Sequence, residues 1–173
     1  MPRRPILLAL TVAVVTFAVI VGIVTLNQFA ATDSIARDAP APGITGETLD
    51  GAAFDLADLR GSPVIVNFWG PSCVPCRDEF PLFQAKLEQH ADDGLVIVGV
   101  LMHDPPEPAR SFVTDFDATW PTVLDEGGAI RGAYRTVARP TSYFIDRDGI
   151  LRSIQIGEVR DADFERQYAL IAS

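Results

Sequence analysis

Residues 68–81 read FWGPSCVPCRDEFP and contain the two cysteines of the chain, Cys73 and Cys76. The apolar run over residues 63–69 leads into them and predicts a strand. Apolar residues recur at helical spacing after them, at Phe80, Phe83 and Leu87. The sequence therefore predicts that a strand delivers both cysteines to the first turn of a helix, where two intervening residues keep the sulfur atoms close enough to bridge.

The start of a helix changes the chemistry of a cysteine. Free backbone N–H groups and the positive end of the helix dipole stabilise a thiolate, so Cys73 is expected to be acidic and nucleophilic near neutral pH. An inert structural disulfide is the alternative, although such a small loop restricts the unfolded chain little. A zinc site is a further alternative, but His90 and His103, the only histidines, do not lie at finger-like spacing from the cysteines. We therefore predict a redox pair and no metal site.

Length and charge limit the class of protein. After the N-terminal segment about 140 residues remain, which is enough for one domain with its own core. The formal net charge of the chain is −9. This acidic balance argues against nucleic acid or an anionic lipid surface as the main partner.

The N-terminal segment predicts the compartment. Residues 1–5 carry Arg3 and Arg4, and residues 6–26 carry no charge. As a helix that run would span roughly 32 Å at 1.5 Å per residue, against about 30 Å for the hydrocarbon core. We expect a cytoplasmic N-terminus over 1–5 and a single-pass signal-anchor over 6–26 in the cell membrane, with the rest of the chain extracytoplasmic. A cleaved signal peptide is the alternative, with a small-residue site at residues 34–36.

The remaining chain is expected to form a linker over residues 27–43, stiffened by Pro40 and Pro42, and one folded domain over 44–173. The expected elements are a hairpin over 44–56 with an Asp50-Gly51 turn, a helical turn over 57–60, a strand over 64–68, a helix from Cys73 to about His90, a strand over 95–101, a helix over 108–116, a strand over 121–124, a helix over 129–134, strands over 140–146 and 150–156, and a last helix capped by Asp161 or Asp163. This order predicts an α/β fold with a mixed central sheet and helices on both faces.

The cysteine motif over 68–76, the downstream Arg139-Pro140-Thr141 and the strand–Asp-Gly–strand hairpin that follows resemble the thioredoxin fold. More narrowly, the chain resembles the membrane-anchored TlpA/ResA/CcmG group of thiol–disulfide oxidoreductases. Four features carry this narrower resemblance: the anchor, the extra N-terminal hairpin, the motif tail over 77–81 and the long segment over 101–125.

The resemblance implies that Cys73 attacks a client disulfide and that Cys76 resolves the mixed disulfide, with no cofactor beyond this redox-active pair. The implied clients are protein thiols and disulfides, such as apocytochrome c in cytochrome c biogenesis, and a transmembrane thiol electron donor would re-reduce the pair. The alternatives are a disulfide donor, a general envelope thiol reductase for cell redox homeostasis, and a non-catalytic anchored binding module with a structural disulfide. A peroxiredoxin is disfavoured because the Pro-x-x-x-Thr-x-x-Cys pattern does not precede Cys73.

The resemblance also assigns the surroundings of the pair. Trp69 is expected to form an aromatic wall beside the disulfide, with ordinary core packing as the alternative. Pro75 stiffens the turn between the cysteines. Pro140 matches the family's cis-proline, which with Thr141 shapes a groove for an extended substrate, and a trans loop proline is the alternative.

Two charged residues are candidates for tuning the pair. Asn67 stands where thioredoxins carry a buried acid, and Glu79 matches a ResA-like glutamate three residues after the second cysteine. We expect Glu79 to be the acid–base group for Cys76, and a surface charge is the alternative. Arg139 departs from the usual apolar residue before the proline. It is expected to favour the Cys73 thiolate or to contact an acidic substrate, and a solvent-directed side chain is the alternative.

Overall fold

The computed structural model of the chain describes residues 15–17 and 35–172. Residues 15–17 are helical and fall inside the predicted anchor. The rest of the span over 6–26 and the N-terminus over 1–5 lie outside the described residues. Within the part of the chain that is described, no helix combines the length and the apolar character that crossing a membrane requires. The unit that carries the fold begins at Ala36.

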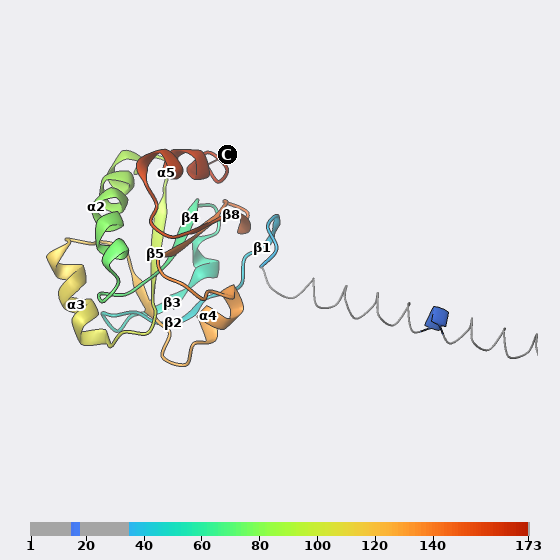
Figure 1. Ribbon diagram of the computed structural model, residues 1–173. Helices are drawn as coiled ribbons and strands as arrows, with labels where there is room; N and C mark the ends of the chain where they lie inside the picture. Colours follow the sequence, from blue (N-terminus) through green and yellow to red (C-terminus); the bar gives the residue numbers. More distant parts are fainter. Residues whose placement is uncertain (1–14, 18–34, 173) are drawn as a thin grey trace, which may run out of the picture. The chain divides into compact units, whose positions relative to one another are not determined.

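A six-stranded mixed sheet forms the centre of this unit (Figure 1). Its strands are β1 (Ala39–Pro40), β4 (Val64–Trp69), β5 (Val96–Leu101), β6 (Thr122–Leu124), β7 (Thr141–Ile145) and β8 (Ile150–Ile156). They lie in the order β1-β8-β7-β4-β5-β6. The strands β4, β5 and β6 are parallel to one another, and β7 runs antiparallel to both β4 and β8. The predicted mixed α/β sheet is confirmed.

Helices pack on both faces of the sheet because its central strands are apolar on both sides. Every residue of β4 is buried. On one face, α2 (Val74–Gln89) and α5 (Asp161–Tyr168) contribute Phe80, Phe83 and Phe164 to the same hydrophobic cluster as Ile65. On the other face, Tyr134 of α4 (Ala129–Tyr134) packs its ring 5.4 Å from that of Phe68.

The helix α2 begins at the cysteine motif, as predicted. Cys73 is its N-cap residue and His90 its C-cap residue, and Pro81 lies within it. The helix α3 (Pro106–Asp115) starts two residues before the predicted position, because Pro106 has the backbone angle that the first helical position requires.

The predicted cap of the last helix is wrong. Arg160 is the N-cap residue of α5 and makes no side-chain capping bond. Asp161 instead forms an ion pair with Lys86 of α2, with 2.8 Å between Oδ1 and Nζ. Asp163 pairs with Arg166 within the helix. Both aspartates still lie in the first turn, where negative charge is favourable for the helix dipole.

The extra N-terminal hairpin is confirmed. It consists of β2 (Thr45–Glu47) and β3 (Ala53–Asp55), which pair antiparallel. Gly51 in the turn has φ of 86°, a left-handed conformation that glycine adopts without strain. A short 3₁₀ helix, η1 (Leu56–Leu59), follows, and its first free N–H, that of Ala57, donates to the Asp55 carboxylate at 2.9 Å.

The start of the folded unit differs from the prediction. The strand β1 pairs with β8, and the Asp38 N–H donates to the Leu151 carbonyl at 2.8 Å. The Asp38 carboxylate also lies 2.8 Å from Arg152 Nη1. The linker predicted over 27–43 therefore ends earlier, and the domain predicted over 44–173 begins earlier, at Ala36. A two-residue edge strand held by backbone hydrogen bonds leaves no apolar period in the sequence to detect it.

Candidate active site

The two cysteines form a disulfide at the start of α2. Their Cα atoms lie 5.3 Å apart. The Cys73 N–H donates to the Gly70 carbonyl at 3.0 Å and so closes the turn that leads into the helix. Cys73 retains 7% of its surface, whereas Cys76 is fully buried. Cys73 is therefore the more exposed cysteine of the pair, and its role as the nucleophile stays a prediction.

The residues between the cysteines form the exposed rim of the site. Val74 and Pro75 are both exposed. Pro75 occupies the first turn of α2, where a helix has no use for the N–H that proline lacks. The motif thus places a rigid apolar turn over the disulfide.

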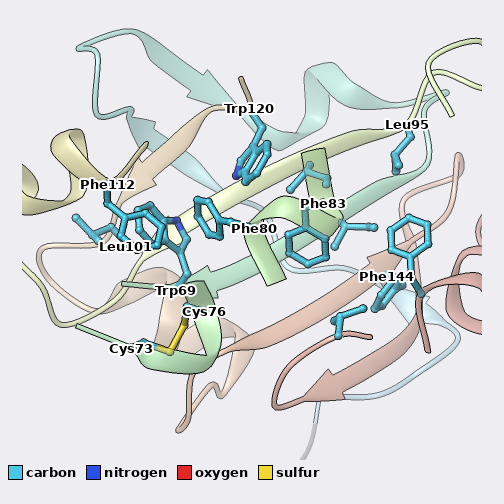
Figure 2. Close-up of a cluster of buried hydrophobic side chains, with 14 of the residues drawn as sticks. Trp69, Cys73, Cys76, Phe80, Phe83, Leu95, Leu101, Phe112, Trp120 and Phe144 are labelled. Carbon is cyan, nitrogen blue, oxygen red and sulfur yellow. A yellow bond between two sulfur atoms is a disulfide. The ribbon is translucent and has the colours of Figure 1, made fainter. Parts of the chain in front are cut away.

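Trp69 lies in the core and not at the surface. It is fully buried, and its ring centroid lies 4.8 Å from that of Phe80 and 5.0 Å from that of Phe112. Figure 2 shows Trp69 next to the disulfide, with these two rings beyond it. Trp69 is therefore a core residue, as the alternative has it, that also belongs to the same buried cluster as the disulfide, and its part in the active site stays a prediction.

The loop before β7 meets the motif from the other side. The Arg139–Pro140 peptide bond is cis, as the resemblance implies. Thr141 lies opposite Phe68 in the β4–β7 register, so this loop stands at the end of β4 that leads to Cys73. The Thr141 hydroxyl donates to the Ala138 carbonyl at 2.8 Å and fixes the loop from within.

Glu79 is buried beneath the pair. It lies one helical turn after Cys76 and is fully inaccessible to solvent, so the alternative of a surface charge is wrong. The Asn67 side-chain amide donates to Glu79 Oε1 at 2.7 Å, and the Val159 N–H donates to Oε2 at 3.1 Å. Asn67 also donates to the Ser142 hydroxyl at 3.0 Å. Asn67, which stands where thioredoxins carry a buried acid, thus hydrogen-bonds to Glu79, the acid that α2 supplies.

Burial changes the acidity of this carboxyl group. It raises the pKa of Glu79 to about 8, against the two hydrogen bonds from Val159 and Asn67, which favour the charged form. An ordinary cysteine thiol has a pKa of about 8.5. Glu79 therefore holds a proton over part of the neutral pH range and can give or take one there.

Arg139 does not point freely into solvent. Its Nη1 lies 2.8 Å from Asp104 Oδ2, and its Nη2 donates to the Ser72 hydroxyl at 2.7 Å. The guanidinium also donates to the Met102 carbonyl. The sequence reasoning found Arg139 but missed Ser72 and Asp104. Asp104 follows a buried strand parallel to β4, and this position would have placed it at the same edge of the sheet as the cysteines.

The remaining polar groups of the region do not gather into a metal site. Among residues 15–17 and 35–172, no three His, Cys, Asp or Glu side chains are placed to hold a metal ion together. His103 contacts Arg131, with 2.6 Å between Nε2 and Nη1, and His90 contacts Asp93 at 3.1 Å. The disulfide is the redox group that the described residues supply.

Comparison with known proteins identifies the family. Residues 38–154 match the AhpC/TSA family. The thioredoxin-like protein YneN of Bacillus subtilis is 32% identical over 133 residues, which cover 75% of this chain and 77% of YneN. The thiol-disulfide oxidoreductase ResA of Bacillus cereus is 33% identical over 118 residues, 68% of each chain. The crystal structure of a putative thiol:disulfide interchange protein DsbE from Chlorobium tepidum superposes with a TM-score of 0.74 at 27% identity, covering 81% of this chain and all of the other.

The cysteine motif indicates which chemistry of this family applies. In a peroxiredoxin pattern the threonine and proline would stand three and seven residues before Cys73, but Gly70 and Val66 occupy those positions. The disulfide at the start of α2 is instead that of a thiol exchanger. The chain belongs to the thioredoxin-like AhpC/TSA family and is a thiol–disulfide oxidoreductase similar to ResA and YneN.

Proposed function

We propose that this oxidoreductase is held in the cell membrane by residues 6–26, with its folded unit outside the cytoplasm, and that it reduces disulfides in client proteins such as apocytochrome c. The observation that carries the chemistry is a pair in which Cys73 keeps 7% of its surface exposed while Cys76 and Glu79 are fully buried. The resemblance to the ResA/CcmG group supports the reducing direction, the client and the membrane location.

The reaction starts from the reduced pair. The Cys73 thiolate, favoured by the free N–H groups and dipole of α2, attacks one sulfur of the client disulfide. The client disulfide breaks, a mixed disulfide forms on Cys73, and the first client thiolate leaves and takes up a proton. Cys76 then attacks Cys73, which releases the second client thiolate and forms the Cys73–Cys76 disulfide. The client gains two electrons and the enzyme loses two.

Glu79 serves the second half of this reaction. Cys76 is fully buried and must lose its proton before it can attack. Glu79, one turn further along α2, is the group placed to take that proton. Because its pKa is about 8, the ionised fraction that can accept the proton grows as pH rises toward 8. When a transmembrane thiol donor re-reduces the pair with two electrons, Glu79 returns the proton to Cys76.

The reduction potential of Cys73–Cys76 in the full chain, solubilised in detergent and equilibrated with dithiothreitol and glutathione buffers, tests the direction. A value near or below the thioredoxin figure of about −270 mV supports a reductant. A value near the strong-oxidant figure of about −120 mV overturns the reducing assignment and identifies a disulfide donor. A disulfide that reduces only when the fold is lost would be structural.

Trapping tests the client. A Cys76→Ser variant lacks the resolving thiol, so it should accumulate mixed disulfides through Cys73 in living cells. Recovery of an apocytochrome c in these complexes, and its absence with the double variant Cys73→Ser/Cys76→Ser, supports the proposal. Complexes that contain only other envelope proteins would overturn the assignment to cytochrome c maturation and identify a general thiol reductase.

A further inference from the structure

Three side chains from three separate segments meet beside the nucleophile. Ser72 comes from the turn before α2, Asp104 from the segment after β5, and Arg139 from the loop before β7. The Ser72 N–H donates to Asp104 Oδ2 at 3.1 Å, and its hydroxyl donates to Oδ1 at 2.9 Å. Arg139 completes the triangle through its contacts with both residues. Since Ser72 directly precedes Cys73, this network holds the residue next to the reactive sulfur.

We propose that Asp104 is a positioning residue for Cys73, which fixes Ser72 and neutralises Arg139 so that the Cys73 thiol is less acidic and the disulfide less oxidising than Arg139 alone would make them. The inference rests on the nucleophilic role of Cys73 in the proposed function. It does not depend on the client or on the membrane location.

Gly70 packs directly against this ion pair. A Cβ atom added at Gly70 would lie 2.3 Å from both Arg139 Nη1 and Asp104 Oδ2, and 3.1 Å from the Met102 carbonyl. Gly70, which follows β4, therefore makes room for the two charged groups directly against the backbone of the motif. The charged groups of Asp104 and Arg139 therefore lie within the site and not on its solvent-exposed surface.

The two charged groups are also largely shielded from solvent, so water screens their effect on a neighbouring group only in part. The Asp104 side chain is 13% exposed and that of Arg139 is 20% exposed. Burial by itself would raise the pKa of Asp104, but the Ser72 N–H, the Ser72 hydroxyl and Arg139 together hold it below its usual range. Asp104 is thus a carboxylate at neutral pH, and the pair with Arg139 carries no net charge.

The other charged groups near the motif are the same in the unmodified protein and in variants of the Asp104–Arg139 pair. On α2, Arg77 and Asp78 have opposite signs and are exposed, and Glu79 lies buried beneath Cys76. The hollow that Asp104 lines also holds Asp125, Glu126 and Arg131, and Arg131 contacts His103. Removing one member of the Asp104–Arg139 pair therefore leaves its partner as a new net charge beside Cys73.

This charge balance gives opposite effects for the two halves of the pair. Without Asp104, the unpaired Arg139 stabilises the Cys73 thiolate, which stabilises the reduced enzyme and makes the disulfide a stronger oxidant. Without Arg139, the unpaired Asp104 disfavours the thiolate and has the reverse effect. If the network had only a structural role, the acidity of Cys73 would change in the same direction in both variants or would change in neither.

The experiment follows the pH dependence of Cys73 alkylation in the reduced full chain, with the labelled residue identified by mass spectrometry, and the exchange equilibrium with glutathione. For Asp104→Asn we expect the alkylation midpoint to fall, so that the thiolate fraction below the midpoint rises about three- to tenfold. For Arg139→Gln we expect the midpoint to rise by a similar factor, and for the double variant a return close to the unmodified protein. The glutathione equilibrium should move toward the reduced enzyme for Asp104→Asn and toward the oxidised enzyme for Arg139→Gln.

Asp146→Asn is the matched control. Asp146 also binds an arginine, Arg152, and accepts two backbone N–H groups, those of Asp148 and Ile150. It follows β7 at the opposite end of the sheet from the cysteines, so its loss should leave the Cys73 midpoint unchanged. A shift as large as that of Asp104→Asn would show a general effect of loosening the fold and overturn the proposal.

The remaining outcomes are equally decisive. Midpoints that move in the same direction in both single variants, or that do not move, overturn the proposal and leave the proposed function intact. Labelling of Cys76 in place of Cys73 in the unmodified protein would overturn both. If Asp104→Asn does not fold, Arg139→Gln alone decides, because its expected rise in the midpoint is independent.

Discussion

At the scale of single residues, Glu79 has a pKa far above the ordinary value of a glutamate. A carboxyl group without access to solvent keeps its proton to higher pH, and here burial raises the pKa to about 8. The unfolded chain has no such burial, so its glutamate ionises near 4.5. Between these two pH values unfolding releases a proton, and the folded state therefore loses relative stability as pH rises from about 4.5 to about 8.

Glu79→Gln should remove this loss. The amide keeps the size of the side chain and an oxygen that can accept one of the two hydrogen bonds, but it cannot ionise. We expect the free energy of unfolding of the variant to exceed that of the unmodified oxidised protein above pH 8 by about 2–5 kcal/mol, and the two to converge near pH 5. Urea unfolding at several pH values measures this. Two curves that stay parallel over the whole range would contradict the assignment of the raised pKa to Glu79.

A second residue-scale prediction concerns Gly99 of β5. A Cβ atom added there would lie 2.5 Å from Thr122 Oγ1 and 2.6 Å from Trp69 Nε1. Because the Trp69 ring is fixed between Phe80 and Phe112, it cannot give way freely. Gly99→Ala should therefore destabilise the protein by about 1–3 kcal/mol, as over-packed cores do.

Gly132→Ala provides the control for Gly99→Ala. Gly132 lies within α4, and an added Cβ atom meets nothing within 4 Å. Alanine is the better helix former by about 0.5–1 kcal/mol, so thermal unfolding of this variant should occur at the same or a higher temperature. Equal losses of stability in both variants would contradict the packing argument.

At the scale of elements, the helices α2 and α5 are joined by the only lysine of the chain. Lys86 is 5% exposed, and its Nζ binds both Asp161 and Glu165 of α5. The same nitrogen lies 5.3 Å from the ring centroid of Phe164. The side chain thus covers apolar surface with its stem while its charge reaches the carboxylates at the rim.

Lys86→Ala should lower the free energy of unfolding by about 1–3 kcal/mol, since it removes both the buried stem and the partner of two carboxylates. Arg166→Ala is the comparison, because Arg166 pairs with Asp163 on the exposed side of one helix. Such surface pairs contribute about 0–1 kcal/mol. Chemical denaturation of both variants checks the difference, and equal losses would show that burial of Lys86 has no part in joining the helices.

The elements also show what the sequence could and could not predict. The strands β4 and β5 were predicted because burial on both faces leaves uninterrupted apolar runs, and Glu79 was found through its fixed distance from Cys76. The edge strand β1 left no such pattern, because it is two residues long and is held by backbone hydrogen bonds and the neighbouring Asp38–Arg152 ion pair, not by apolar side chains. The contact of Asp104 with Arg139 was missed because it joins loops from distant parts of the chain, which only the strand order brings together.

At the scale of the whole molecule, the folded unit stands close to the proposed anchor along the chain. It begins at Ala36, so residues 27–35 are what separates it from the predicted membrane span over 6–26. At about 3.3–3.6 Å per residue, nine residues can reach about 32 Å at most. Under the proposed anchoring, this short tether would limit the folded unit to clients and to an electron donor that reach the extracytoplasmic face of the cell membrane.

The anchor itself gives the last prediction. Val15→Arg together with Phe17→Arg would place two charges in the middle of the predicted span, at about 2.5–3.5 kcal/mol each on the insertion scale. We expect the unmodified chain to stay in the membrane fraction through an alkaline wash and the double variant to be lost from it. Leu170→Arg, at an exposed position of the folded unit, adds charge without touching the span and should behave like the unmodified chain.

Two further readouts separate an anchor from a cleaved signal. A membrane-impermeant thiol reagent should label Cys73 in intact cells that hold the reduced enzyme, because the folded unit is expected outside. The mass of the membrane-bound chain should include residues 1–35. A shorter chain that begins near residues 34–36 and washes free of the membrane would show that the N-terminal segment is removed, and the enzyme would then meet its clients by diffusion and not along the membrane surface.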